Sequence, residues 1–340
     1  MANINQRELD AIQRLLRANA TMGDIVLQLK ERDLTYSATG WDDLFTKRIV
    51  PALRNGSLSR NDLVQWLRDA EEYGRQHVFI YQCSKAAASQ IVNENAVKQE
   101  LGRLGRTDLL TNPRVVEEPP QPTVCDVRFE HGIFGRALVV KVVEIRYHER
   151  FVGESSPSDN RIIREYERVS TRAVSVARVH EDGFAEMRVY SHRTKTDYTN
   201  ELEELWSICN VFVPRLRFDE VSIGNAQRNL WKNRRQLGAT IRYTSSELHD
   251  EKGTVLSAAT GGSNLSLFDT DKAAKSLDTF WDDTATCDRS NVWWIKGDPR
   301  PSRDIHILMS GKVNELTVTT QCNREDYDYV LDQLRKANKQ

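Results

Sequence analysis

The side chains most able to do chemistry in this sequence are the cations of one segment, in a chain that is otherwise close to neutral. Between Arg215 and Arg242 there are seven Lys and Arg residues against only Asp219 and Glu220, whereas the 340-residue chain has a formal net charge of −1. On a helix over 222–236, three of these cations would share one face, at i, i+4 and i+7. A row of cations of this kind can follow a phosphate backbone.

We therefore predict a nucleic-acid-binding surface in this segment. The residues expected to contact phosphates are Arg228, Lys232 and Arg235, with Arg234 and Arg217 in support. The indole of Trp231 is expected beside this face, where it would add an aromatic surface to the cations. The competing interpretation is a basic helix face that contacts only solvent.

The sequence lacks the motifs of several common enzyme classes. It has no P-loop, no G-x-G-x-x-G fingerprint, no H-E-x-x-H helix, no paired C-x-x-C zinc site and no G-x-S-x-G elbow. We therefore predict no catalytic residue, no metal site and no cofactor, and we favour a protein that is not an enzyme. Asp250-Glu251-Lys252 resembles the end of a metal-dependent nuclease site, but the following Gly253 favours a hairpin turn.

Composition and the N-terminal stretch predict a soluble, intracellular protein, cytoplasmic or, in a eukaryote, nuclear. Charged residues make up 29% of the chain, and no run of about 18 apolar residues could span a membrane. The N-terminal stretch lacks the apolar core of a signal peptide. The five cysteines are scattered without a C-x-x-C pair, which is typical of reduced thiols.

The chain divides into a helical part, a linker and a strand-rich part. Residues 1–112 are predicted to form a small helical bundle that recruits a partner, with capping boxes at Thr21 and Ser59. Within it, residues 71–91 contain the strand-like run "HVFIYQC", but the flanking sequence favours helix, and helix is predicted. Four prolines in 113–122 predict a stiff linker.

Residues 123–340 are predicted to form an antiparallel-sheet domain, so the fold class is α+β. Runs rich in Val and Ile predict strands, with turns at 181–183 and 250–253 and a flexible loop at "GESSPSDN" (153–160). Helices are predicted after Asp197, over 222–236 and at the C-terminus.

Two thirteen-residue segments, 186–198 and 315–327, echo each other within this domain. The identical positions, all at one offset, are Glu186/Glu315, Val189/Val318, Asp197/Asp326 and Tyr198/Tyr327, and Leu202/Leu331 and Leu205/Leu334 continue the match. In both copies the valine should face the core, the aspartate should cap a helix and the leucines should pack that helix on the sheet. An internal duplication would give halves 123–211 and 237–340, joined by the basic helix 222–236. The alternative is that two unrelated strand–helix junctions look alike.

The stretch "RQHVFIYQCSK" (Arg75–Lys85) resembles the centromere protein N / Chl4 kinetochore family. The order of a helical N-terminal domain, a connector and a strand-rich α+β region is also similar. The resemblance implies binding to DNA or to a nucleoprotein without catalysis, and pairing with a second subunit. It implies no recognition residue at a numbered position.

Three functions are compatible with these observations. The first is a non-enzymatic nucleic-acid- or nucleoprotein-binding protein that works in a complex, as a homo- or hetero-oligomer with a protein partner. The second is an adaptor of a multi-subunit assembly, for example in defence, without nucleic-acid contact. The third is a metal-dependent nuclease with a dispersed site.

Overall fold

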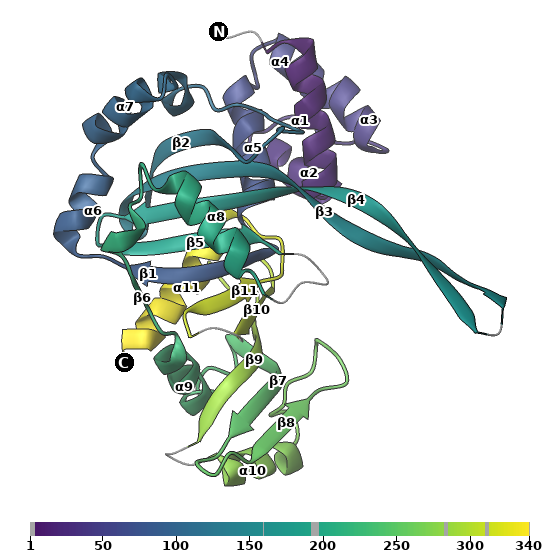
Figure 1. Cartoon of the computed structure of the whole chain (residues 1–340), viewed down its shortest axis with the longest axis vertical. Coiled ribbons are helices and arrows are strands. Elements are labelled where there is room, and N and C mark those ends of the chain that lie inside the picture. The colour runs from purple at the N-terminus through teal and green to yellow at the C-terminus, as the bar shows by residue number, and fades with distance from the viewer. Residues whose placement is uncertain (1–3, 159, 192–196, 282–284, 310–312, 340) are drawn as a thin grey trace.

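The computed structural model describes residues 4–158, 160–191, 197–281, 285–309 and 313–339. It confirms the α+β class, because helices precede and cover one large sheet whose strands pair in the antiparallel sense (Figure 1). None of the helices in the described ranges is long and apolar enough to cross a membrane. All five cysteines are buried and unbridged.

The N-terminal helices form a layer with a core of its own. They are α1 (Gln6–Asn19), α2 (Met22–Lys30), α3 (Trp41–Leu44), η1 (Phe45–Ile49), α4 (Val50–Arg54) and α5 (Arg60–Glu72). Leu16, Leu29 and Leu63 are fully buried at its centre. The capping boxes predicted at Thr21 and Ser59 are confirmed, since each side chain accepts a hydrogen bond from the backbone three residues on.

The helix predicted over 71–91 is wrong at its centre, where Gln76–Gln82 forms strand β1. This strand lies in the middle of the sheet and pairs with a neighbour on each side. Its side chains from Val78 to Tyr81 are all buried, because both faces of the sheet are covered there. A strand covered on both faces reads as a continuous apolar run instead of an alternating one. The part of the chain before the linker therefore supplies the central strand.

The sheet has eleven strands, ten of them in the order β2-β3-β4-β5-β1-β11-β10-β9-β7-β8, with β6 paired to β1. Their bounds are β2 (Thr123–Gly132), β3 (Gly135–Ser158), β4 (Arg161–His180), β5 (Phe184–Tyr190), β6 (Asp219–Glu220), β7 (Ile241–His249), β8 (Val255–Ala259), β9 (Thr286–Trp294), β10 (Ile305–Met309) and β11 (Glu315–Val318). Both predicted hairpin turns are confirmed, between β4 and β5 and between β7 and β8. Gly183 and Gly253 take the positive φ angles that these turns require, 93° and 80°.

Different helices cover the two faces of the sheet. One face packs against α6 (Lys85–Ile91), α7 (Glu94–Arg103), η2 (Thr107–Leu110) and α8 (Thr199–Cys209). The opposite face, towards the C-terminal strands, packs against α9 (Gly224–Lys232), α10 (Asp271–Phe280) and α11 (Arg324–Lys339). The short η3 (Arg215–Arg217) precedes β6.

The two echoed segments flank β1 and send their helices to opposite faces. Val189 lies across from His77 and Val318 across from Gln76, so the two valines point to opposite sides of the sheet. Both are buried, as predicted, and α8 and α11 pack on opposite faces. A half-turn about β1 would therefore exchange the two strand–helix units, a symmetry that a duplication would also produce.

The aspartates of the echo differ in role. Asp197 accepts a hydrogen bond from the Thr199 backbone at 2.9 Å, next to the start of α8. Asp326 lies within the first turn of α11, where Asn323 accepts from its backbone at 2.8 Å. The prediction that Asp326 caps its helix is therefore wrong, because Asn323 does so.

The Pro-rich linker is held at several points along its length. The carbonyl of Pro113 accepts a hydrogen bond from Arg60 at 2.7 Å, and Glu117 forms an ion pair with Arg14 at 2.7 Å. The linker therefore lies against the helical layer.

Candidate functional site

Strands β3 and β4 continue past the rest of the sheet as a two-stranded projection. The pairing of β3 with β2 ends at Val143, and the pairing of β4 with β5 ends at Val176. Farther out, β3 and β4 pair with each other as far as Ser158 and Arg161. We call residues 144–158 and 160–173 the ribbon arm. At about 3.3 Å per residue it is roughly 45 Å long, and it extends away from the body of the molecule (Figure 1).

The flexible loop predicted at 153–160 is wrong over most of its length. Residues 153–158 belong to β3, and Gly153 and Ser155 lie across from Glu165 and Ile163. The register shifts by one residue between Phe151 and Gly153, so Val152 is the extra residue of a β-bulge. Glycine and serine predicted a loop here, but pairing with β4 keeps the strand extended.

One side of the arm, which we call the aromatic face, carries aromatic and charged residues in alternating rows. It comprises Tyr147, Glu149, Phe151 and Glu154 on β3 and Ile162, Arg164, Tyr166 and Arg168 on β4, by their pairing and by the alternation along each strand. The rings of Phe151 and Tyr166 lie edge to face, 5.8 Å apart. The Arg168 guanidinium lies 4.2 Å from the centre of the Tyr147 ring.

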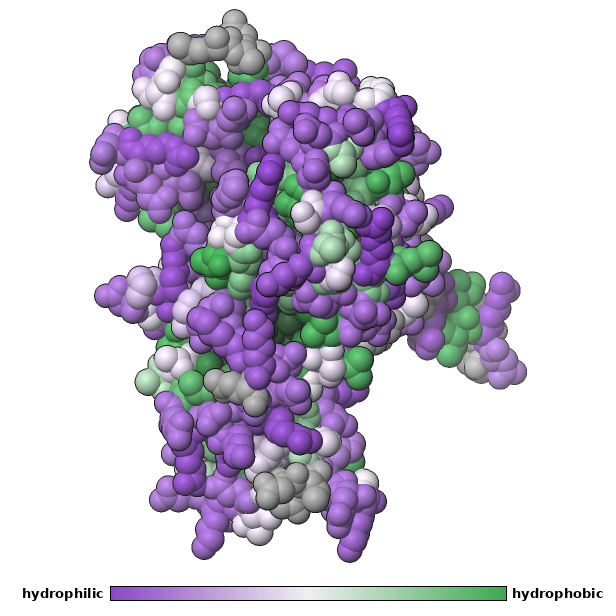
Figure 2. All heavy atoms as spheres, turned by 90° about the vertical axis from the view of Figure 1, so that its left-hand side faces the viewer, coloured by the Kyte–Doolittle hydropathy of each residue, from purple (hydrophilic) through white to green (hydrophobic). Residues whose placement is uncertain are grey.

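Six large apolar side chains of the arm are exposed. The exposed fractions are 59% for Tyr147, 53% for Phe151, 59% for Val152, 62% for Ile162, 36% for Ile163 and 54% for Tyr166. In Figure 2 the projecting part of the molecule shows hydrophobic residues between hydrophilic ones. A two-stranded ribbon has no core in which to bury such side chains, and isolated hairpins are marginally stable in water. Exposed apolar side chains gathered on one projection make the arm a candidate interaction surface.

The charges of the arm balance. Residues 144–173 contain six arginines against five glutamates and one aspartate. Several neutralise each other: Arg150 lies 2.5 Å from Glu167, and Arg164 lies 2.7 Å from Glu154. The arm therefore offers no excess of positive charge to a phosphate backbone.

The base of the arm is anchored to the helical layer. Arg172 forms an ion pair with Glu71 at 2.5 Å, at the end of α5, and donates to the carbonyl of Val116 at 2.8 Å. On the other strand, Arg146 donates to the carbonyl of Tyr190 at 3.2 Å. These contacts fix the direction in which the arm leaves the sheet.

A buried ionic cluster continues from this anchor across the sheet. The Lys141 ammonium lies 2.7 Å from Glu71 and 3.1 Å from Glu72, and Arg128 lies 2.6 Å from Glu72 and 2.7 Å from Asp126. Burial alone would raise the pKa of Glu72, but the charges of Arg128 and Lys141 outweigh it and hold this pKa well below its usual range. The cluster joins α5 to the sheet.

A second group of buried polar residues lies between β4, β5 and α11. The Glu186 carboxylate lies 3.1 Å from His180 and accepts a hydrogen bond from Tyr327 at 2.6 Å, while Arg178 pairs with Asp328 at 2.5 Å. Burial lowers the pKa of His180, which favours its neutral form. At most 2% of Glu186, His180 or Tyr327 is exposed, so a substrate cannot reach this His–Glu pair. We interpret the group as structural.

The five residues predicted to contact nucleic acid do not form one surface. Helix α9 ends at Lys232, so only Arg228 and Lys232 lie on it, and both are exposed. Arg235 lies in the turn that follows, where its guanidinium pairs with Asp278.

The two supporting arginines are engaged elsewhere. Arg234 is 9% exposed, pairs with Asp278 and donates to the carbonyl of Trp231 at 2.7 Å. Arg217 lies in η3 and donates to the side chain of Gln90, just before the end of α6, at 2.5 Å.

Trp231 lies inside the core and not beside a basic face, so that prediction is wrong. It is fully buried, and its ring lies 5.1 Å from that of Tyr243 and 5.4 Å from that of Phe268. The indole anchors α9 to the sheet and offers no surface to a base.

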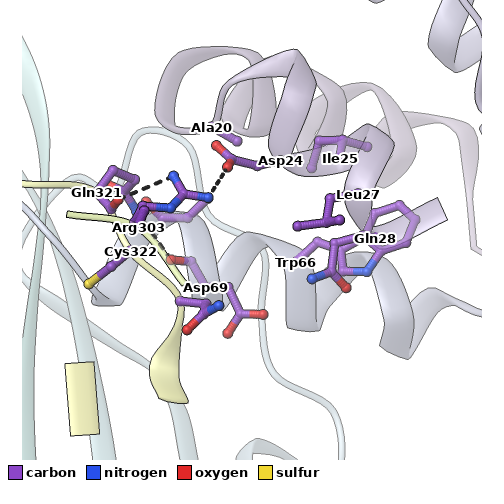
Figure 3. A pocket seen from close by; sticks show the side chains of 12 residues that line it. Ala20, Asp24, Ile25, Leu27, Gln28, Trp66, Asp69, Arg303, Gln321 and Cys322 are labelled. Atoms are coloured by element: carbon purple, nitrogen blue, oxygen red, sulfur yellow. Dashed lines mark hydrogen bonds and ion pairs between the residues drawn. The ribbon is translucent and has the colours of Figure 1, made fainter. Parts of the chain in front are cut away.

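A small pocket lies where the helical layer meets the sheet (Figure 3). Asp24 of α2 pairs with Arg303 at 2.8 Å, and Gln321 donates to the backbone carbonyl of Asp69 at 3.2 Å. Burial raises the pKa of the Asp69 carboxyl to about 7, although the hydrogen bond from Gln65 lowers it. The pocket volume of about 50 Å³ suits one or two water molecules and no larger ligand.

Residues able to hold a metal do not gather in the described parts of the chain. In those ranges no three His, Cys, Asp or Glu residues are arranged to bind an ion. Asp250, considered above as part of a nuclease site, accepts hydrogen bonds from the backbones of Lys252 and Thr254 at 2.9 and 2.7 Å. It shapes the turn between β7 and β8.

No known protein-family profile matches this sequence, and no curated protein is significantly similar to it. The resemblance at Arg75–Lys85, a segment that forms β1 and the start of α6, therefore stays a prediction.

The ribbon arm was not predicted from the sequence. The pattern that could have revealed the arm is the regular spacing of the apolar residues Tyr147, Phe151, Ile162 and Tyr166. They occur in strands whose other residues are too polar for a protein core.

Proposed function

We propose that this chain is a non-enzymatic subunit of a protein assembly and that it engages a partner protein through the ribbon arm. The observation that carries the proposal is the row of half-exposed aromatic and aliphatic side chains on the arm, from Tyr147 to Tyr166. Tyrosine and arginine, which both occur on this face, are enriched among the residues that dominate protein interfaces. The balanced charge of the arm favours a protein over a nucleic acid as its partner.

The anchoring of the arm supports the same function. A ribbon fixed at its base by Arg172 and Arg146 loses little conformational freedom on binding. Such preorganisation improves affinity without new contacts. The helical layer, joined to the base through Glu71, would set the orientation of the arm relative to the rest of the subunit.

Site-specific photocrosslinking in the host cell tests the proposal. A photoreactive amino acid in place of Phe151 should yield a discrete adduct with another polypeptide, and the Tyr166→Asp substitution should abolish this adduct. The same probe at Tyr36, which is 41% exposed on the helical layer, serves as the control. Adducts that are the same from both positions, or that survive Tyr166→Asp, would contradict a role for the arm.

A second candidate function is contact with nucleic acid through α9. Arg228 and Lys232 are exposed one helical turn apart, and neither forms an ion pair within the described ranges. Anisotropy titrations with single- and double-stranded DNA and RNA at several salt concentrations test it. Binding that weakens steeply with salt and is lost in Arg228→Gln/Lys232→Gln, but not in Lys252→Gln, would support this function. Binding that ignores salt, or that survives the double substitution, would exclude it.

A further inference from the structure

The aromatic face of the arm repeats its charges in a regular order. On one side of the Phe151/Tyr166 pair, Glu149 lies across from Arg168; on the other side, Glu154 lies across from Arg164. In both rows the glutamate is on β3 and the arginine on β4. The row that separates them is aromatic on both strands.

We propose that the partner at this face is a second copy of the same chain; the inference rests on the proposed function of the arm. When β3 of one arm lies over β4 of the other, Glu149 faces Arg168 of the second copy. In the same arrangement Phe151 faces Tyr166 of the second copy, and Glu154 faces Arg164 of the second copy. A symmetric dimer needs a surface that complements itself in this way.

The opposite arrangement is electrostatically unfavourable. With β3 over β3, the glutamates of one copy would lie over those of the other, and the arginines likewise. Like charges placed opposite each other in an interface select against the wrong orientation. The order of charges on the face therefore specifies one of the two ways in which the arms could pack.

The area available is that of a modest but specific interface. A Phe or Tyr side chain has about 150–250 Å² of surface, and those of the aromatic face are about half exposed. With Ile162 and the stems of the charged residues, each arm would bury roughly 600 Å². Two arms reach roughly 1,200 Å², the lower end of the range for specific protein interfaces.

Charge-reversal variants and sedimentation equilibrium of the purified full-length chain test the proposal. Wild type should be dimeric at micromolar concentration, whereas Glu149→Arg and Arg168→Glu should each be monomeric. An equal mixture of the two variants should recover a dimer, because the arginine introduced by Glu149→Arg in one copy would then meet the glutamate introduced by Arg168→Glu in the other. Within each variant arm, positions 149 and 168 still carry like charges, so a purely intramolecular effect would not be rescued by mixing.

The variant with both reversals in one chain provides a readout that does not depend on the single variants folding. Its arm regains an opposite pair at positions 149 and 168, so it should dimerise with itself. It should not exchange subunits with tagged wild type, because like charges would then meet between the copies. Free exchange with wild type would overturn the proposal.

The outcomes separate this inference from the proposed function. A monomeric wild type at about 100 μM, or a mixture of single variants that stays monomeric, would overturn the second copy as partner. If the Phe151 probe still yields an adduct with a different protein, the arm is an interface and only the identity of its partner is wrong. Absence of both dimer and adduct would overturn both.

Discussion

The clearest quantitative prediction concerns Lys141, the buried cation that joins the sheet to α5. Its ammonium lies 2.7 Å from Glu71 and 3.1 Å from Glu72, and the three side chains are 5%, 0% and 0% exposed. Lys141→Met keeps most of the aliphatic stem but leaves two buried carboxylates with less positive charge. We expect the folded state to lose stability mainly through electrostatics.

The magnitude follows from the partners that remain. Removing one member of a buried ion pair typically costs about 3–5 kcal/mol, because the other charge is left uncompensated. Here Glu71 keeps Arg172 at 2.5 Å and Glu72 keeps Arg128 at 2.6 Å. We therefore expect the lower end of the range, about 3 kcal/mol in the free energy of unfolding at pH 7.

Urea unfolding followed by tryptophan fluorescence measures this loss. Lys252→Met, in the exposed turn between β7 and β8, is the matched control and should change the stability by less than about 0.5 kcal/mol. A loss below about 1 kcal/mol for Lys141→Met would contradict this prediction, since it would mean that the cluster does not depend on this charge.

The pH dependence adds a second check. A carboxyl group whose pKa is lowered by folding stabilises the protein above its unfolded pKa of about 4.3, and this contribution is lost as the pH falls. Glu72 is such a group, and without Lys141 its pKa in the folded state rises. The difference in stability between wild type and Lys141→Met should therefore shrink progressively as the pH falls below about 4. A difference that is constant with pH would point to packing instead.

Three further tests, two of them with a matched second variant, have defined outcomes. Folding raises the pKa of Asp69 to about 7, so the wild-type protein loses stability as the pH rises from about 4 to 7. Asp69→Asn should remove this loss and should be more stable than wild type by about 1–2 kcal/mol at pH 8. Equal dependence of stability on pH in the two proteins would contradict this prediction. In Gly183→Ala the added Cβ would lie 2.2 Å from a backbone carbonyl oxygen, so the loss of stability should reach about 3 kcal/mol or more. Gly253→Ala, where the added Cβ would meet open space, should cost about 1 kcal/mol. Similar shifts in melting temperature for the two variants would argue against the clash at Gly183. Arg234→Gln breaks a partly buried ion pair, although Asp278 keeps Arg235 as a partner, and should cost about 2–3 kcal/mol. Arg228→Gln, at an exposed position, should be nearly neutral. The same denaturation assay ranks the two variants, and the reverse order would show that the two roles were misassigned.

Local signals in the sequence predicted the parts of the fold that depend on local physics. The capping boxes at Thr21 and Ser59, the glycine turn between β7 and β8 and the buried Val189 and Val318 are each set by neighbouring residues or by simple alternation. The α+β class follows from the order of these elements.

The remaining features depend on contacts that are distant in the sequence. Strand β1 was predicted as helix because its partners, β5 and β11, lie about 100 and 240 positions away, and no pattern within the segment reveals them. The charge of Arg234 is neutralised by Asp278, and the residues next to Arg234 in the sequence do not indicate this pairing. The ribbon arm was missed because the alternation of residue types along a strand shows only that its two faces differ. It does not show whether either face is covered by other parts of the protein.

The central position of β1 has a consequence for synthesis of the chain on the ribosome. This strand emerges early, yet its β11 edge stays open until Glu315–Val318 has been made. At about 5–20 residues per second this takes roughly 12–50 seconds, during which an apolar strand edge is available to chaperones or to other nascent chains. Ribosome-bound chains of increasing length should therefore keep a protease-sensitive β1 until residue 318 has left the exit tunnel, and early protection would show that β5 and the covering helices suffice.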